Sequence, residues 1–388
     1  MFMTMVDYWY MTGDATYNSN AVAALDWQAG ATGTFMPANQ TTTEGNDDQV
    51  FWGFAAMTAA EFNFPSPAAG YPSWLAMAQG VFNLQAGRWD ASTCGGGMRW
   101  QIFPTNNGYT YKNAVANGGF FQLASRLARY TGNSTYVDWA TKEWDWFADS
   151  VLFDNKTYAI YDGSSDLANC ASADHTQWSY NYGIYLVGLA YLYNHTEDAR
   201  WLTPLTGILN ATLAEFFPTS MGNKIAVEVT CQPLGNCDVD ATFFRGFVLR
   251  WLSLTAQLVP TTAATIWPYL QASALGAAGQ CDGGTDGVTC GMEWNTTKWD
   301  GTYGIGQQLS ALSVVQTNLI QTMNLGAPYT SNSGGTSKGD PSAGSTAENP
   351  SEGEIYTRRI TSRDRAGAGI LTFLAVALTL GGAYFLVT

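Results

Sequence analysis

Two adjacent aspartates, Asp47 and Asp48, are the residues whose type and spacing best suit chemistry. They lie in Glu44–Gly53 (EGNDDQVFWG), before the stretch Gln49–Glu61 that is expected to be a helix. An acid at a helix start commonly caps free N–H groups. Of two neighbouring acids, one can cap, while the like charge raises the pKa of the other. An ionised and a protonated carboxyl side by side can act as nucleophile and proton donor in glycosidic bond cleavage.

Aromatic, amide and charged side chains gather at the other expected helix entrances. Aromatic rings offer flat apolar faces to the C–H side of a sugar, and polar groups hydrogen-bond its hydroxyls, so a neutral carbohydrate is the expected ligand. About half of the 15 tryptophans are expected in the core instead, among them Trp27, Trp139, Trp144, Trp146 and Trp201. The predicted substrate contacts are Trp52, Trp100, Tyr111, Lys112, Asn113, Asn117, Asn181, Tyr182, Asp240, Arg245, Trp299 and Tyr303.

A repeated break in the sequence predicts the helices that position these residues. Short polar turns such as Tyr10–Tyr17, Tyr130–Tyr136 and Tyr193–Trp201 each follow the pattern of a helix end and a capped helix start. With two further breaks, the turns are centred near positions 13, 65, 132, 195 and 260, at intervals of 52, 67, 63 and 65 residues. A period near 60 of helix, tight turn and helix predicts an array of αα-hairpins.

The other connections are long, and they hold all six cysteines. They run roughly over residues 30–47, 86–112, 153–177, 218–240 and 277–299. In hairpins that stand side by side, these loops share one end of the array. Functional residues are expected at that end.

The helix count predicts an all-α fold, an (α/α)6 toroid of helical hairpins. Five hairpins are followed by a helix over about 303–323 that has no partner, and a closed ring needs a twelfth helix. We expect this helix before Met1, because residues 1–10 also lack the basic region and cleavage site of a leader. The alternative is an open solenoid, which would expose the apolar faces of two edge helices.

The composition excludes several function classes. Only 12% of the 388 residues are charged, against about 25% in ordinary domains, and the formal net charge is −14. A nucleic-acid partner is excluded because phosphate binding needs a basic surface. The two histidines, His175 and His195, leave little room for a histidine metal centre or a Ser-His-Asp triad. No metal and no cofactor are therefore expected.

Cysteines and sequons predict the secretory pathway. The six cysteines form an even set without zinc-like spacing. Cys231–Cys237 and Cys281–Cys290 each lie within one loop, which leaves Cys94 to pair with Cys170. The candidate glycosylation sites are Asn39, Asn133, Asn155, Asn194, Asn210 and Asn295.

The C-terminal sequence predicts two segments after a helical domain over residues 1–325. Residues 326–365 are rich in Ser, Gly and Thr and are expected to form a disordered stalk. Residues 366–388 carry no charge after Arg365, so they are either one membrane span or the signal for a glycosylphosphatidylinositol (GPI) anchor. The GPI interpretation is favoured because nothing follows Thr388. Attachment near Ser351–Gly353 or Thr361–Ser362 fits equally well.

Several motifs follow one another along the chain: Asn46–Trp52, the glycine run before Trp100, Tyr111–Asn113, Ser179–Gly183, Phe244–Phe247 and Trp299–Tyr303. They resemble glycoside hydrolase family 76, above all its fungal GPI-anchored Dfg/Dcw-type mannan endo-1,6-alpha-mannosidases. The resemblance covers about residues 5–325 and implies the toroid and a retaining mechanism on α-1,6-linked mannose. It implies that Asp47 is the nucleophile and Asp48 the general acid/base.

The resemblance also implies the partners and the location. The expected substrates are α-1,6-mannose glycans of mannan or of the GPI core, with water, β-glucan or another wall glycan as acceptor. The chain is expected to be a monomer at the outer face of the plasma membrane or in the cell wall. The resemblance further implies a leader, a first helix and an aromatic-rich segment before the second helix, which are expected upstream of Met1 and should contribute to the cleft wall.

Two other functions are compatible with parts of this sequence. A non-catalytic mannan-binding wall protein could keep the same scaffold, but the intact pair Asp47 and Asp48 argues against it. A helical toroid that acts on isoprenoids would need a DDxxD motif, whereas Gln49–Trp52 follows Asp48. The favoured interpretation is a mannosidase or transglycosidase.

Overall fold

The computed structural model describes residues 1–40, 43–345, 369–372 and 376. The chain divides into two units, Met1–Ala347 and Glu348–Thr388. Within the described residues, we find no helix that is both long and apolar enough to span a membrane. The predicted tail over 366–388 and both predicted attachment segments fall almost wholly outside the described residues, so these predictions are not tested.

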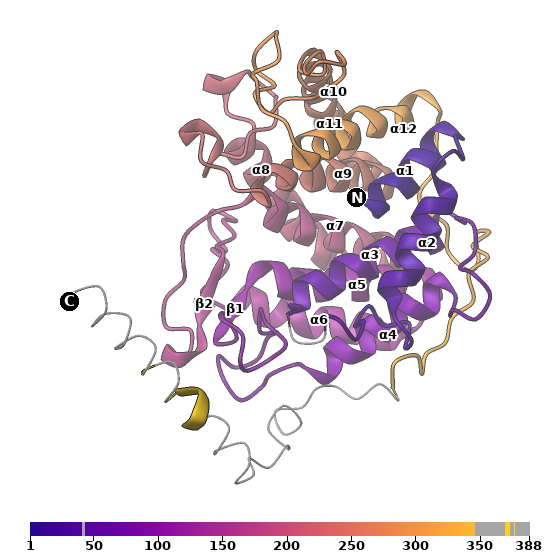
Figure 1. Cartoon of the computed structure of the whole chain (residues 1–388), viewed down its shortest axis with the longest axis vertical. Helices are drawn as coiled ribbons and strands as arrows, with labels where there is room; N and C mark the ends of the chain where they lie inside the picture. Colours follow the sequence, from indigo (N-terminus) through magenta and orange to yellow (C-terminus); the bar gives the residue numbers. More distant parts are fainter. Residues whose placement is uncertain (41–42, 346–368, 373–375, 377–388) are drawn as a thin grey trace. The chain divides into compact units, whose positions relative to one another are not determined.

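Six helices of the first unit form an inner ring (Figure 1). Each packs against the next in the series, and α1 contacts both α3 and α11, so the ring closes. This arrangement confirms the predicted toroid. The inner helices are α1 (Phe2–Thr12), α3 (Asn46–Glu61), α5 (Ala114–Thr131), α7 (Ser179–Thr196), α9 (Ala241–Leu258) and α11 (Ile305–Thr317).

A second layer of helices packs outside the ring, each against the inner helix that precedes it. The tight turns fall where the sequence predicts them, and Gly13 and Gly132 end α1 and α5 with φ of 75° and 72°. The final predicted helix is shorter than expected, and the predicted helix before Met1 stays a prediction. The outer helices are α2 (Asn18–Ala29), α4 (Trp74–Gly87), α6 (Ser134–Asp149), α8 (Leu202–Phe216), α10 (Ala263–Gly279) and the four-residue α12 (Leu319–Thr322).

The long loops carry the little strand that the described residues contain. Strands β1 (Tyr111–Asn113) and β2 (Gly163–Ser165) pair antiparallel, with Tyr111 opposite Ser165. They join the loop before α5 to the loop before α7. Short 3₁₀ turns lie at Asp166–Ala168, Ala199–Trp201, Thr219–Met221, Gln232–Leu234 and Pro260–Thr262.

Three disulfides brace these loops, in the pairing that the sequence predicts. Cys94–Cys170 links the loop before α5 to the loop before α7, while Cys231–Cys237 and Cys281–Cys290 each close a single loop. The six sequon asparagines are all exposed, so each can be reached by a glycosylating enzyme. The Asn194 amide is engaged, because its Nδ2 donates to the carbonyl of Leu258 at 2.9 Å. Occupancy of the sequons stays a proposal.

A buried ionic network ties the inner helices together. Arg250 of α9 donates to both carboxylate oxygens of Asp7 of α1, at 2.5 and 2.9 Å, and to Thr58 of α3. Arg126 of α5 also donates to Thr58, and it pairs with Glu61 of α3 at 2.6 Å. Each charge is taken out of water but paired and hydrogen-bonded. The network therefore fixes how α1 closes the ring.

Replacing Asp7 with alanine is expected to lower the free energy of unfolding by about 3–5 kcal/mol, because it leaves the Arg250 charge buried and unpaired. The matched control is Asp145→Ala, which breaks an exposed pair with Arg200 and should cost about 0–1 kcal/mol. Urea unfolding of both variants measures the difference. Equal losses would show that the Asp7 pair does not hold the ring.

The structure corrects the prediction of a disordered stalk from residue 326. Residues 326–345 lie along the helical domain, and Figure 1 shows them passing α2 and reaching α4. Tyr329 N donates to Glu61 O at 2.9 Å, and Asn83 of α4 donates to the carbonyls of Pro341 and Ala343. The segment is ordered by hydrogen bonds to distant helices, which its Ser- and Gly-rich composition cannot reveal. Residues 346–365 are not described.

Candidate active site

The first turn of α3 holds the aspartate pair. The helix begins at Asn46, three residues earlier than predicted, so Asp47 and Asp48 belong to it. Asp48 Oδ2 accepts the backbone N–H of Gly45 at 2.8 Å, which is one half of a capping box. The Asn46 N–H donates to the carbonyl of Trp100 at 2.8 Å. These bonds fix the helix start against the glycine-rich loop before α5.

The two carboxylate oxygens of Asp47 differ in their hydrogen bonding. Its Oδ2 accepts the indole N–H of Trp100 at 2.9 Å. Its Oδ1 is shielded from solvent and has no hydrogen-bond partner among the described residues. A Cβ on Gly45 would lie 2.3 Å from that oxygen, so only glycine leaves room for it. A buried carboxylate oxygen without a partner is rare in folded proteins, so it marks Asp47 as a candidate functional residue.

Neighbouring acids shift one another's pKa. Burial and the charge of Asp48 raise the pKa of Asp47 to about 7, although the hydrogen bond from Trp100 opposes the shift. Asp48 reaches solvent within the cleft, and its pKa is also raised, by desolvation and by Asp240. Burial and the Asp48 charge raise the pKa of Glu44 to about 8. The two carboxyls are therefore electrostatically coupled: a charge on one disfavours ionisation of the other, an arrangement that suits acid/base catalysis.

The pair opens into a cleft of about 550 Å³ at the long-loop end of the ring. Aromatic rings form its walls: Trp52 stacks on Phe2 and on buried Phe35, at 5.9 and 6.0 Å between centroids, and Tyr180 stacks on Phe244 at 4.0 Å. Such walls match the apolar faces of sugar rings. The N-terminal residues Met1–Met3 also line the cleft.

Five predicted substrate contacts line this cleft: Trp52, Trp100, Tyr111, Asn113 and Asp240. Tyr111 donates its hydroxyl to Asp162 at 2.9 Å, and Asn113 caps α5 through the N–H of Ala116. Asp240 is exposed at the start of α9. These five keep their predicted place beside the aspartate pair.

Three predicted contacts are buried away from the cleft and have structural partners. Lys112 donates to the carbonyls of Asp90, Thr93 and Gly96, at 3.0, 2.9 and 2.7 Å. Asn117 accepts from the N–H of Met98 and donates to its carbonyl. Arg245 donates to Gln232 and to the carbonyl of Met292, and its guanidinium lies 3.7 Å from the Trp294 ring centroid. Each organises a loop, so we do not propose these three as substrate contacts.

Four further predicted residues also lie outside the cleft lining. Tyr182 is buried against Phe216. Asn181 is buried behind the cleft, where its amide and Tyr111 counteract the rise that burial imposes on the pKa of Asp162. Trp299 and Tyr303 line a separate depression. The sequence places all four at the correct end of the ring, but it cannot show which way the side chains point.

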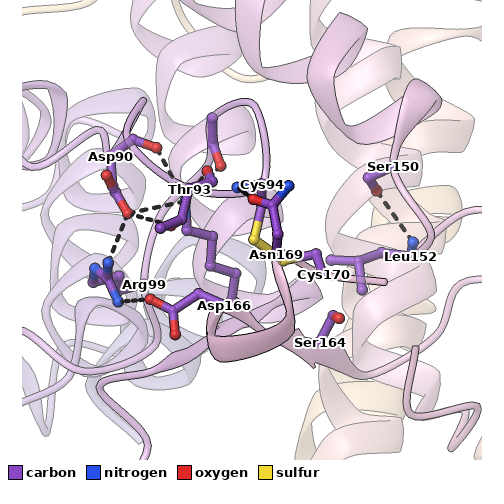
Figure 2. Close-up of a disulfide and its surroundings, with 12 residues drawn as sticks. Asp90, Thr93, Cys94, Arg99, Ser150, Leu152, Ser164, Asp166, Asn169 and Cys170 are labelled. Carbon is purple, nitrogen blue, oxygen red and sulfur yellow. Dashed lines mark hydrogen bonds and ion pairs between the residues drawn. A yellow bond between two sulfur atoms is a disulfide. The ribbon is translucent and has the colours of Figure 1, made fainter. Parts of the chain in front are cut away.

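Charged side chains, among them Asp90 and Arg99, hold the loop that precedes Trp100 (Figure 2). Arg99 pairs with Asp90 at 2.8 Å and with Asp166, next to the disulfide Cys94–Cys170. Burial would raise the pKa of Asp90, but hydrogen bonds from Ser92, Thr93 and Lys112 hold it far below its ordinary value. A Cβ on Gly97 would lie 2.4 Å from the Trp146 ring, which explains a glycine there. The Trp100 indole is thus held on a rigid loop.

Sequence reasoning missed several cleft residues. Asp162 enters the cleft because β2 pairs with β1, and apart from its place in a long loop the sequence carries no signal for it. Tyr180 and Phe244 lie inside the motifs Ser179–Gly183 and Phe244–Phe247, whose local pattern does not show which side chains enter the cleft. Further missed wall residues are Phe51, Phe243 and Phe247.

Replacing Trp100 with phenylalanine is expected to move the acidic limb of the kcat/KM profile to higher pH. The indole hydrogen bond lowers the pKa of Asp47, so its loss raises that pKa, and Asp47, the predicted nucleophile, is ionised only above it. We expect kcat to fall by about 10-fold below pH 7, which corresponds to the loss of one hydrogen bond to a charge. Measuring the profile from pH 4 to pH 9 tests this.

The matched control is Trp74→Phe. The Trp74 indole donates to the carbonyl of Pro65 at 2.9 Å, at the tight-turn end of the ring. This variant should keep the acidic limb of the kcat/KM profile at the wild-type pH. If that limb stays in place or moves to lower pH in Trp100→Phe, the role given to the Trp100 indole is contradicted.

Comparisons with known proteins agree with this geometry. The sequence model of Glycosyl hydrolase family 76 matches residues 1–332. The chain is 48% identical to the Saccharomyces cerevisiae protein named mannan endo-1,6-alpha-mannosidase DCW1 over 369 residues, 95% of this chain and 80% of that protein. It is 46% identical to the Candida albicans protein named mannan endo-1,6-alpha-mannosidase DFG5 over 401 residues, 98% of this chain and 86% of that protein.

Solved structures share the fold. The crystal structure of Dfg5 from Chaetomium thermophilum in complex with glucosamine has a TM-score of 0.84 and 42% identity, and the match covers 89% of this chain and 84% of that one. The α-1,6-mannanase GH76A of Salegentibacter sp. HEL1_6 has a TM-score of 0.65 at 18% identity, over 82% of this chain and 88% of that one, which supports the fold alone. The chain belongs to glycosyl hydrolase family 76.

Proposed function

We propose that this chain is a retaining endo-α-1,6-mannosidase or transglycosidase that acts on mannose-containing glycans during fungal cell-wall assembly. The observation that carries the proposal is the unpartnered Oδ1 of Asp47, beside Asp48, in an aromatic-walled cleft. The names of the similar proteins from Saccharomyces and Candida support the substrate class. A protein that only binds mannan would not need a buried reactive oxygen.

The proposed reaction has two steps on the same carboxyl pair. A carboxylate oxygen of Asp47 forms a bond to the anomeric carbon of mannose as the glycosidic bond breaks, while Asp48 gives its proton to the departing oxygen. Asp48 then removes a proton from the acceptor, whose oxygen displaces Asp47. Water as acceptor gives hydrolysis, and a second glycan gives transfer.

Contacts in the cleft support the separate roles proposed for Asp47 and Asp48. The Trp100 hydrogen bond holds Asp47 in the orientation that leaves Oδ1 free. The backbone bond from Gly45 keeps Asp48 over the helix start. We propose Trp52, Tyr111, Asn113 and Asp240 as substrate contacts, since they line the same cleft.

Hydrolysis and transfer differ in their products. Incubation with an α-1,6-linked mannotetraose, with and without a β-1,3-glucan oligosaccharide, followed by mass spectrometry, separates them. Shorter mannose oligomers alone indicate hydrolysis, and mixed mannose–glucose products indicate transfer. A chain that binds the tetraose but leaves it intact under both conditions would favour the mannan-binding alternative.

We also propose that the protein is a monomer held by a GPI anchor at the outer face of the plasma membrane or transferred to the cell wall. The uncharged C-terminal sequence and the six exposed sequons support the secretory route. Release of the membrane-bound protein by a phosphatidylinositol-specific phospholipase tests the anchor. Retention in the membrane after this treatment would favour a membrane span.

A further inference from the structure

A second depression, of about 560 Å³, lies at the entrance to α11. Among the residues that line it are Trp299, Tyr303, Asp286, Thr289 and Gln308, and no residue is shared with the lining of the catalytic cleft. The depression is therefore a separate feature of the long-loop end. Its residue types are those of a carbohydrate site: aromatic rings with amide, hydroxyl and carboxylate groups.

Trp299 is held in place before any ligand arrives. Its indole Nε1 donates to the carbonyl of Thr302 at 2.7 Å, and its backbone N–H donates to Asp282 at 3.1 Å. Its ring lies over Gly283, where a Cβ would be 2.2 Å from the ring. The disulfide Cys281–Cys290 closes the same loop. A fixed ring costs little conformational entropy on binding.

Large apolar groups beside Trp299 remain in solvent. Tyr303 is 75% exposed and Ile305 is 52% exposed, and both line the depression. A ligand that covers them would gain hydrophobic free energy. Thr289 and Asp286 also line the depression and offer hydrogen-bonding groups, and Asp286 is the single charged group in the lining. A neutral, hydroxyl-rich ligand with apolar faces fits this mixture.

The depression and the catalytic cleft lie on two sides of the start of α9. A Cβ on Gly306 would meet Thr242 and would lie 3.3 Å from the ring of Phe243, which lines the cleft. Gly304 and Ile305, next to Gly306, line the depression. One short segment therefore separates the two sites.

We propose that this depression is an accessory subsite that binds neutral hexose units of a glycan extending beyond the catalytic cleft. The inference rests on the proposed function. Trp299 stacks against one sugar face, and Tyr303 covers the next unit. The hexoses come either from the mannose chain that is cleaved or from the glycan acceptor, and the experiment distinguishes these sources.

The test uses the Asp47→Asn protein, after enzymatic removal of its N-glycans, so that ligands bind without turnover. Nuclear magnetic resonance follows the indole N–H signals during titration with an α-1,6-linked mannohexaose or, separately, a β-1,3-linked glucohexaose. The Trp299 signal is assigned by its loss in Trp299→Phe. We expect it to shift with at least one oligosaccharide, while the exposed Trp27 signal stays in place. A shift of the Trp299 signal with the mannohexaose shows that the subsite binds the mannose chain that is cleaved. A shift with the glucohexaose shows that it binds the glycan acceptor.

Tyr303→Ala should weaken the affinity read from the Trp299 signal by about 3- to 10-fold, the worth of one aromatic contact. If the Trp299 signal stays fixed with both oligosaccharides while the Trp100 signal moves, the accessory subsite is refuted and the proposed function stands. If neither signal moves, the proposed function fails as well. Unchanged affinity in Tyr303→Ala would also overturn the subsite, provided that its melting temperature matches the parent.

Discussion

Asp47→Asn is expected to lower kcat on α-1,6-mannose oligosaccharides by about 10⁴-fold or more, the range seen when a catalytic nucleophile is lost. The amide keeps the shape of the side chain and can still accept the Trp100 hydrogen bond, but it cannot form the glycosyl ester. Turnover measured by reducing-end release gives the loss directly.

The same substitution should not destabilise the fold. The pKa of Asp47 is raised to about 7, so its folded form binds a proton more tightly than its unfolded form. This contribution to stability is present at acidic pH and is lost as the pH rises through 7. Asparagine removes the charge, so we expect an equal or higher melting temperature at pH 8.

Asp145→Asn is the matched control, because this acid lies on the outer helix α6 and is exposed. It should keep normal turnover. Near-normal turnover in Asp47→Asn would remove Asp47 from the mechanism, whereas a lowered melting temperature would assign its loss of activity to misfolding.

Asp48→Ala is expected to lower kcat by about 10²- to 10⁴-fold on natural linkages, which is the usual worth of a general acid/base. Some substrates have a leaving group that needs no proton, such as a dinitrophenyl α-1,6-mannobioside. With these, the rate of the first step should fall far less. Added azide should then restore turnover, because it attacks the mannosyl-enzyme without a base. The measurement is the rate of dinitrophenol release with and without azide.

The configuration of the azide product separates the two aspartates. In Asp48→Ala, azide displaces Asp47 from the covalent intermediate and gives the α-mannosyl azide. In Asp47→Ala, azide takes the place of the nucleophile and gives the β-mannosyl azide. The opposite pattern would exchange the two roles, and no rescue in either variant would argue against a double-displacement mechanism.

The ring could be predicted from the sequence because its signal is periodic. Tight turns recur near positions 13, 132 and 195, and the structure confirms them: Gly13 and Gly132 end the first two helices, and Glu197 ends the third, each with a positive φ. The aspartate pair could be predicted as well, because two adjacent acids at a helix start have a local chemical meaning. Both features depend on residues that are close in the sequence.

The features that the sequence did not reveal depend on distant contacts. Asp162 reaches the cleft only through the pairing of β2 with β1. Lys112 and Arg245 look like substrate-binding cations in the sequence, but in the structure they donate hydrogen bonds to backbone carbonyls of distant loop residues. Residues 326–345 look disordered by composition, yet Asn83 and Gln79 of α4 hold them. The direction of each of these side chains is set by residues distant in the sequence, which a local sequence pattern cannot identify.

The most direct test of the central claim is peptide mass spectrometry after incubation with an α-1,6-linked 2-deoxy-2-fluoro-mannobiosyl fluoride, which forms but slowly releases the glycosyl-enzyme. The account predicts one mannobiosyl adduct per chain, on the carboxyl of Asp47. An adduct on Asp48 or another residue, or complete turnover of the fluoride without any adduct, would contradict it.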